Sequence, residues 1–346
     1  MLRRKEKMGF HGGFNLLDTY PLKFCNIIEE IQSDRTPEKF EFHFPDQKIR
    51  HVIVNLCPTE PWALPNWVVL GHKTTAFLDK LYEMKTRYFP EASVSIAINK
   101  RETEFVAKAI GYANAADWIK IYTLDPKYPQ DDPVMFAKVI LGLDINFGQN
   151  ITTQGIFIFD AQTLLAIYDT CILKNTVNSR LITLSGSGLK ENEIVRVRLG
   201  TSIDTLLQHR TQEAIKYNIF VNGPLRGREI TDISQKIDWS VNNIVVLKDQ
   251  DSKVIFPMLK SDELAFTTNI LGEPRQCVYC NFCDNICPVE LEPALYYHSY
   301  IRGEKHKARL YHLEKCIECG LCSFICPSKL ELLRINKECK ALDRKT

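Results

Sequence analysis

The sequence has no apolar run long enough to cross a membrane. A spanning helix needs roughly 18 consecutive apolar residues. The nearest candidate, IFIFDAQTLLAIYDTCIL at residues 156–173, is interrupted by Asp160, Gln162 and Asp169, and it is typical of a strand followed by an amphipathic helix. We therefore expect a soluble or peripheral protein without a transmembrane segment of its own.

An excess of charge of one sign is also missing. The 346 residues carry 44 Lys and Arg against 42 Asp and Glu, which gives a formal net charge of +2. This balance gives no reason to expect binding to nucleic acid or a polybasic membrane anchor. The basic start MLRRKEKMGFHGGF has no apolar run behind it, unlike a secretory signal. We expect a cytoplasmic protein, free or held at the cytoplasmic face of a membrane by partner subunits.

No motif of a self-contained enzyme stands out. The sequence offers no clear acid–base pair or nucleophile, and the Gly-rich SGSGLK at 185–190 is more typical of a hairpin turn than of a phosphate loop. His298, His306 and His312 are more typical of solvent-facing helical histidines than of metal ligands. We therefore predict no catalytic residue.

Cysteine is scarce along most of the chain and dense near its end. Eight of the 12 cysteines lie between Cys277 and Cys326. A chain of this length builds a core without disulfides, and cytoplasmic thiols stay reduced. The dense group is therefore a candidate for zinc or iron–sulfur binding. The remaining cysteines are scattered and are typical of ordinary buried or surface thiols; they are Cys25, Cys57, Cys171 and Cys339.

The dense cysteines form two copies of C-x2-C-x2-C-x3-C-P, CVYCNFCDNICP at 277–288 and CIECGLCSFICP at 316–327. A zinc site usually takes two close pairs from different arms of the chain, whereas three thiolates two residues apart suit three corners of an iron–sulfur cube. In bacterial two-cluster ferredoxins the fourth cysteine of each run binds the other cluster. We therefore predict two 4Fe–4S clusters. The first would be held by Cys277, Cys280, Cys283 and Cys326, and the second by Cys316, Cys319, Cys322 and Cys287.

The segment between the two cysteine runs predicts helices. Pro293 suits a helix start and Gly303 a break, so residues 293–313 favour two short helices within a helical ferredoxin module. Two neighbouring clusters make a path for single electrons, which implies a donor on one side and an acceptor on the other. The basic segment at 302–309 would suit an acidic redox partner, although a solvated helix face is the favoured interpretation.

Upstream of the cysteines, strand and helix patterns alternate, which predicts a parallel α/β sheet. The predicted strands lie at 51–56, 93–99 and 118–124, and the predicted helices at 74–89, 102–113 and 134–142. After residue 150 the pattern changes to a small α+β module of β-grasp type. Its predicted elements are strands at 180–186 and 193–200, a short helix at 203–207 and further strands.

The order of these parts resembles the RnfC family, the peripheral subunits of Rnf-type ion-translocating oxidoreductases. The resemblance rests on RLITLSGSGLKENEIVRVRLGTSIDTLL at 180–207, on VNGPLRG at 221–227 and on the two cysteine runs. The chain is also similar to the A subunit of sodium-translocating NADH:quinone reductase and to the flavin subunit of respiratory complex I. The resemblance covers nearly all of the sequence, but the family's usual N-terminal Gly/Pro-rich β domain is missing.

The resemblance implies three domains and a nucleotide site. Residues 1–150 would form a Rossmann-like α/β domain with a degenerate FMN and NADH site. Residues 151–260 would form a soluble-ligand-binding β-grasp (SLBB) module. Residues 261–346 would form the helical ferredoxin domain with both clusters.

The nucleotide-binding motifs of the family are only half kept. The glycine loop of FMN-binding members keeps Gly9, Gly12 and Gly13 with altered spacing. The motif Asn-Gly-Ala-Glu-Cys-Glu-Pro is NLCPTEP here and keeps Glu60. The motif Lys-Tyr-Pro-Gln-Gly-Gly-Glu corresponds to residues 127–133, where two aspartates that would repel phosphate replace the glycine pair.

These changes favour a retained scaffold with a weakened nucleotide site, in which Gly9, Gly12, Gly13 and Glu60 are remnants of FMN binding. The leading hypothesis is an electron-transfer subunit of a Rnf/Nqr-like or soluble oxidoreductase complex. It would relay electrons between a partner flavoprotein or ferredoxin and another subunit. One alternative is an FMN-dependent NAD(P)H dehydrogenase subunit that feeds its own clusters. Another is an SLBB ligand-binding or assembly adaptor with structural clusters.

Overall fold

The computed structural model describes residues 27–31, 38–71, 73–146, 148–212, 216–248 and 275–343. The chain divides into two compact units. One, which we call the sheet unit, takes Leu16–Pro126 and Asn150–Pro257. The other, which we call the cysteine unit, takes Met1–Asn15, Lys127–Gln149 and Met258–Thr346. The cysteine unit therefore includes an excursion from the middle of the chain, residues 127–149.

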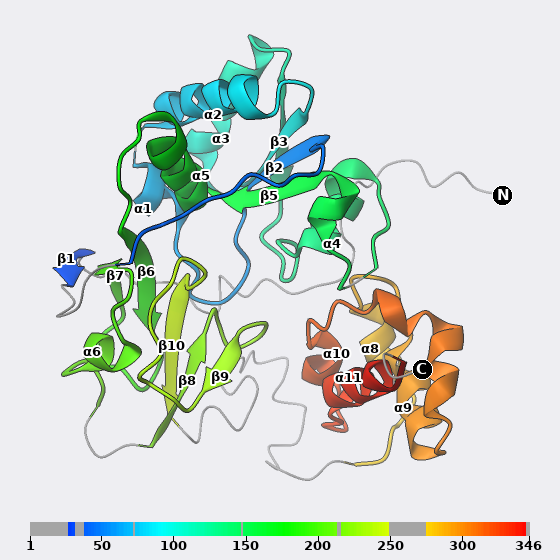
Figure 1. The fold of residues 1–346 in the computed structure, drawn as a ribbon. Coiled ribbons are helices and arrows are strands. Elements are labelled where there is room, and N and C mark those ends of the chain that lie inside the picture. Colours follow the sequence, from blue (N-terminus) through cyan, green and yellow to red (C-terminus); the bar gives the residue numbers. More distant parts are fainter. Residues whose placement is uncertain are drawn as a thin grey trace. The chain divides into compact units, whose positions relative to one another are not determined.

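The first half of the sheet unit is built on a four-stranded parallel sheet, as the alternating pattern predicts. Its strand order is β4-β3-β2-β5, and every pair is parallel. The helices α2 and α3 pack against each other, and α1 packs against α5 (Figure 1). The strands are β2 (His51–Leu56), β3 (Ser93–Asn99), β4 (Ile119–Leu124) and β5 (Ile156–Asp160). The helices are α1 (Asn66–Leu70), α2 (Thr74–Tyr88), α3 (Thr103–Asn114) and α5 (Ala161–Ile167).

The composition of β2 explains why this sheet forms. Parallel strands that are covered on both faces read as unbroken apolar runs, and Val52, Ile53, Val54 and Leu56 are each at most 1% exposed. Helix α2 meets them with apolar side chains spaced three or four residues apart, such as Leu78 and Leu81. Burial of one such leucine contributes about 1.5–3 kcal/mol.

The second half of the sheet unit is a six-stranded mixed sheet with the order β1-β7-β6-β10-β8-β9. Strands β6 and β7 form the antiparallel hairpin that the sequence predicts, with the SGSGLK segment as its turn. The strands are β1 (Ile27–Ile31), β6 (Ser179–Ser185), β7 (Glu193–Arg198), β8 (Tyr217–Val221), β9 (Arg228–Ile230) and β10 (Asn243–Lys248). Helix α6 (Ile203–Leu207) is capped by Ser202, whose side chain accepts a hydrogen bond from Thr205 N.

Polar contacts join the two sheets of this unit. Thr183 Oγ1 donates to the Trp62 carbonyl at 2.6 Å, and the side chain of Gln162 bonds both backbone groups of Leu181. The division that the sequence suggests, after residue 150, falls before β5, which pairs with β2. The α/β part thus extends through α5, because residues 127–149 leave the unit before the chain returns to complete the parallel sheet.

The cysteine unit is helical. Helix α9 ends at Ile301 and a 3-10 helix begins at Lys305, with Gly303 at φ 74° between them, as the sequence predicts. Its helices are α8 (Phe282–Asn285), α9 (Pro293–Ile301), α10 (Leu321–Ile325) and α11 (Leu332–Asp343). Residues 127–149 add α4 (Pro133–Phe136), continued by one π-helical turn (Ala137–Leu141).

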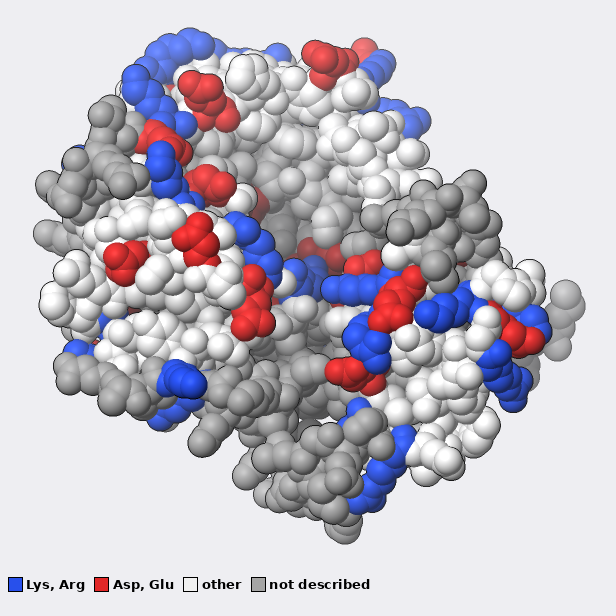
Figure 2. Space-filling model, turned by 60° about the horizontal axis from the view of Figure 1, so that its bottom comes forward, with Lys and Arg blue, Asp and Glu red and all other residues white. Residues whose placement is uncertain are grey.

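The surface shows the charge balance that the composition implies. On the face drawn in Figure 2, acidic and basic side chains lie interspersed rather than in separate patches. None of the helices in the described ranges combines the length and the apolar character needed to span a bilayer. The clustered cysteines therefore remain the main candidate for a functional site.

Candidate metal centres

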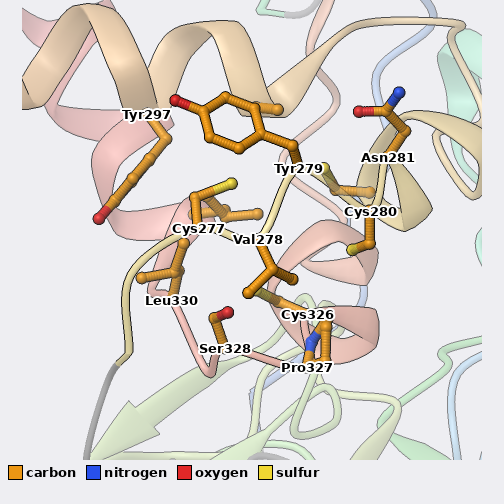
Figure 3. A pocket seen from close by; sticks show the side chains of 13 residues that line it. Cys277, Val278, Tyr279, Cys280, Asn281, Tyr297, Cys326, Pro327, Ser328 and Leu330 are labelled. Carbon is orange, nitrogen blue, oxygen red and sulfur yellow. The ribbon is translucent and has the colours of Figure 1, made fainter.

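The structure gathers the first predicted ligand set around one hollow. Cys277, Cys280 and Cys283 from the first run and Cys326 from the second line it together. In Figure 3 the sulfur atoms of Cys277, Cys280 and Cys326 surround this space. The rest of the wall is mostly apolar, and it includes Val278, Ala294, Tyr297, Leu330 and Leu332.

The second predicted set lines a second hollow. Cys316, Cys319 and Cys322 come from the second run, and Cys287 comes from the first. Each hollow thus takes three cysteines from one run and a fourth from the other, which is the grouping that the sequence pattern predicts. The binding of iron by these eight cysteines stays a prediction.

The arrangement fits a cluster better than a single metal ion. A tetrahedral zinc ion needs four ligands within about 2.3 Å of one point. Among the residues that the structure describes, no three His, Cys, Asp or Glu side chains converge in that way. The thiols instead border a hollow, as the corners of a multi-iron cube require.

The backbone of the two runs repeats with a shift of 39 residues, the step from Cys277 to Cys316. Both copies have left-handed φ values at the same three places, so the backbone of the two loops bends in the same way. Left-handed residues in turns can form concave segments that bind anions and recur at iron–sulfur sites. The matched pairs are Tyr279 and Glu318, Asn281 and Gly320, and Glu290 and Lys329, with φ between 53° and 81°.

The fourth cysteines are also held alike. Cys287 accepts backbone N–H hydrogen bonds from Val289 and from Leu291, the latter at 3.3 Å. Cys326 accepts the equivalent bonds from Ser328 and Leu330. In each case the donors are two and four residues further on, past the proline that turns the chain. Donors to sulfur are one of the means by which proteins tune iron–sulfur clusters.

Burial favours the neutral thiol at Cys283 and Cys287 until a metal displaces the proton. It raises the pKa of Cys283 to about 12, with the neighbouring Asp284 carboxylate as the next cause. It also raises the pKa of Cys287 to about 11. Because iron binds the thiolate, cluster binding here must be coupled to proton release.

The excursion at 127–149 packs on the loop of the second site. Tyr128 is fully buried, and its hydroxyl donates to the Cys319 carbonyl at 2.8 Å. Met135 and Ile317 form a small apolar cluster there, with Val134, Val139 and Val289 at its edge. The sequence indicates a nucleotide motif at 127–133 and gives no signal for this contact, because the partners lie nearly 200 residues apart.

Asp132 shows what has replaced the phosphate-admitting glycines of that motif. It is 5% exposed, and its carboxylate accepts a hydrogen bond from Val134 N at 2.8 Å. This is the N-cap of α4, an arrangement that stabilises a helix start by about 1 kcal/mol. The aspartate therefore fixes the helix that covers the second site.

Glu60, the predicted remnant of the FMN site, is engaged inside the sheet unit. Its Oε1 accepts hydrogen bonds from Leu225 N at 2.8 Å and Arg226 N at 3.4 Å. Gly223, at φ +97°, leaves the room for this contact, since a Cβ there would lie 2.2 Å from Glu60 Oε1. The carboxylate thus secures the NGPLRG turn. Gly9, Gly12 and Gly13 lie outside the described residues.

The basic segment at 302–309 is partly neutralised by its neighbours. Lys305 pairs with Glu338 at 3.7 Å, and Lys307 pairs with Glu304 at 2.7 Å. Of the three histidines near it, His298 stacks on Tyr279 with ring centroids 4.5 Å apart. These contacts favour a solvated helical face over a strongly basic docking site.

Comparison with known proteins supports the geometry. The 4Fe–4S dicluster domain family matches residues 273–330. The C subunit of the ion-translocating oxidoreductase complex of Haemophilus influenzae is 26% identical over 275 residues, 78% of this chain. The C subunit of the Na(+)-translocating ferredoxin:NAD(+) oxidoreductase complex of Acetobacterium woodii is 24% identical over 72% of this chain. The chain is thus similar to the C subunits of Rnf-type complexes.

The chain spans only part of these relatives, 31% of the Haemophilus protein and 52% of the Acetobacterium protein. Among solved structures, a chain of NAD+-reducing [NiFe]-hydrogenase matches with a TM-score of 0.49 and 13% identity. That match covers 87% of this chain and 56% of the hydrogenase chain. A TM-score below 0.5 does not establish a common fold.

The contact between Glu60 and the turn that contains Gly223 leads to a prediction about stability. We expect Gly223→Ala to lower the free energy of unfolding by about 1–3 kcal/mol more than Gly71→Ala, because only the first methyl group meets packed atoms. Gly71 shares the positive φ, at +54°, but has nothing within 4 Å of its Cβ position. Urea unfolding of both variants measures the difference. Equal losses would show that the Glu60 contact does not confine this turn.

Proposed function

We propose that the chain is an iron–sulfur electron-transfer subunit of a multisubunit oxidoreductase complex. It would relay single electrons through two 4Fe–4S clusters between a flavoprotein or ferredoxin and another subunit. The observation that carries this proposal is the exchange of the fourth cysteine, which completes two separate four-thiol sites. The dicluster-family match and the similarity to the C subunits of Rnf complexes support it.

The chain's own residues supply the environment of each centre. When bound, a 4Fe–4S cluster accepts and releases one electron at a time, at a potential set by its surroundings. The thiols would fix its position, the mostly apolar walls would limit access of water, and backbone N–H groups donate to the sulfur atoms of Cys287 and Cys326. Because Cys283 and Cys287 are one helical turn apart and serve different sites, the two clusters would be close neighbours.

The two sites differ in how far they are covered. Val278 and Phe282 at the first site are 63% and 51% exposed, whereas their counterparts Ile317 and Leu321 are 3% and 1% exposed. Residues 127–149 pack on the loop of the second site. The first site instead leaves its apolar rim open, next to Tyr279, which is 65% exposed.

This exposed rim is where we place electron exchange with a partner. Apolar side chains in a contiguous surface patch mark contact sites between proteins. A partner that covered Val278, Tyr279 and Phe282 would lie directly against the first cluster. Tyr279 is held in place for this contact by its stacking on His298.

The remaining domains fit a scaffold role. We propose that the six-stranded half of the sheet unit, with β6 to β10, is an SLBB β-grasp module, and that the parallel-sheet half through α5 keeps the Rossmann-like framework without its flavin. The engagement of Glu60 by the NGPLRG turn supports the loss of FMN, because the carboxylate is already committed within the chain. The electron donor and the electron acceptor would then both be partner subunits. The complex would lie at the cytoplasmic face of a membrane or be soluble.

The crossed ligand sets predict which cysteine substitutions act together. Anaerobically reconstituted protein should bind about eight irons per chain. Cys326→Ala should remove the same electron paramagnetic resonance signal as Cys277→Ala, and Cys287→Ala the same signal as Cys316→Ala. Cys171→Ser, far from both runs in sequence, is the control and should leave both signals. Zinc in place of iron, or grouping of each fourth cysteine with its own run, would contradict the proposal.

The exposed rim predicts a selective kinetic defect. Phe282→Glu should slow electron exchange with reduced ferredoxin on the order of tenfold, because a charge would be buried against an apolar contact. Exchange with reduced methyl viologen, a small molecule that needs no docking surface, should be unchanged. Leu310→Glu is the matched control, since Leu310 is 72% exposed but, unlike Phe282, is not next to a cysteine of either run in the sequence. Equal slowing by both variants, or with both reductants, would argue against this docking face.

A further inference from the structure

Helices α9 and α11 hold equivalent places in the two halves of the cysteine unit. They begin at Pro293 and Leu332, again 39 residues apart. Ala294 and Tyr297 of α9 line the first hollow, and Leu333 and Asn336 of α11 line the second. The repeat therefore places matched side chains beside the two clusters, and their chemistry can be compared position by position.

The comparison shows a polar pair at the second site only. Asn336 and Lys340 of α11 take the positions that Tyr297 and Ile301 have in α9. Ile301 is 57% exposed and uncharged, whereas Lys340 is only 8% exposed. An amide thus lines the second hollow where a phenol ring lines the first, and a nearly buried ammonium group lies one turn further along α11 where α9 has an alkyl group.

Both α11 side chains reach Cys316. Asn336 Nδ2 donates to the Cys316 sulfur at 3.9 Å. Lys340 Nζ donates to the carbonyl oxygen of Cys316 and pairs with Glu318 at 3.1 Å. Because Asn336 and Lys340 are four residues apart, they share one face of the helix. Lys337 reaches the outer side of Glu318 at 3.9 Å, so two ammonium groups face one carboxylate.

Electrostatics at Cys316 point the same way. The Lys340 ammonium is hydrogen-bonded to the backbone of Cys316, so its positive charge lies next to this cysteine and would stabilise negative charge there. The first site has the opposite neighbour: the Asp284 carboxylate lies 3.4 Å from the Cys283 sulfur. Two ammonium groups face the single Glu318 carboxylate at the second centre, whereas the Asp284 carboxylate lies beside the first, so the charge near the second centre is the more positive and favours electron density there.

We propose that Asn336 and Lys340 are positioning residues that raise the reduction potential of the second cluster. Reduction adds one negative charge, which a hydrogen-bond donor and a nearby cation stabilise in a medium of low dielectric constant. Burial alone would lower the potential of this covered site relative to the exposed first site. The α11 pair offsets that effect and keeps the second cluster able to accept an electron from the first. This inference rests on the proposed function.

The test is a redox titration of both clusters, followed by electron paramagnetic resonance, on the reconstituted full chain. Lys340→Met should lower the reduced-to-oxidised ratio of the second cluster at least tenfold at a fixed potential, a shift of about 59 mV for one electron. Asn336→Leu should shift it in the same direction by less. The midpoint of the first cluster should stay where it is in both variants. Cys326→Ala and Cys287→Ala assign the two signals.

Two further variants separate charge from structure. Glu318→Gln removes the carboxylate but keeps Lys340, so it should raise the midpoint of the second cluster. Arg334→Gln removes a cation from the same helix, but its side chain is 54% exposed and paired with Glu331 and Glu338, so it should change neither midpoint. If the Lys340→Met protein does not bind the second cluster, two other variants decide the question. Glu318→Gln should still raise the midpoint of the second cluster, and the charge-preserving Lys340→Arg should leave it unchanged.

The outcomes distinguish this inference from the function on which it rests. If both clusters assemble and Lys340→Met and Asn336→Leu leave the second midpoint unchanged, or move both midpoints equally, the inference is wrong. The same holds if Glu318→Gln lowers the second midpoint or leaves it unchanged. If the unmodified chain binds no iron–sulfur cluster at all, the proposed function itself fails.

Discussion

The exchange of one cysteine between the two runs is the constraint on which the cysteine unit depends. Cys287 completes the hollow of the second run, and Cys326 completes that of the first. Neither hollow gains its fourth thiol unless both runs fold and face each other. The two α helices that follow the runs, α9 and α11, are therefore placed by the same repeat, and so are the left-handed residues that shape each loop. A metal bound at either centre would stabilise both halves, because its ligands come from both.

The same repeat makes the differences between the centres informative. Equivalent backbone positions carry an exposed Val278 and a buried Ile317, or an uncharged Ile301 and a nearly buried Lys340. Val278 and Ile317 hold matched places in the two loops, so the contrast between them resides in the side chains and in what covers them. One centre has an open apolar rim and a neighbouring carboxylate; the other has a cover of chain from residues 127–149 and a neighbouring ammonium group. An electron relay needs such an asymmetry between its ends.

Residues of the half-kept motifs make structural contacts in this chain. Tyr128, in the half-kept KYPQ motif, bonds the backbone of Cys319, and Asp132 caps the helix that covers the second centre. Glu60 secures the NGPLRG turn, for which Gly223 leaves room. In each case a polar group that would be costly to bury alone is hydrogen-bonded within the protein. These residues of the half-kept motifs therefore stabilise the fold through contacts within the chain itself.

The sequence by itself determined the strands and helices, the parallel sheet and the grouping of the cysteines. These features follow from local periodicity, as in HVIVNL, and from the strict C-x2-C-x2-C-x3-C-P spacing, whose physical meaning does not depend on the rest of the chain. Only the tertiary structure decided that residues 127–149 pack with the cysteines, that β5 completes the sheet after residue 150, and that Lys340 lies at Cys316. These contacts join residues that are far apart in sequence, or depend on which face of a helix is covered. The local sequence pattern reveals neither the distant contacts nor the covered helix face, because burial is a property of the assembled chain.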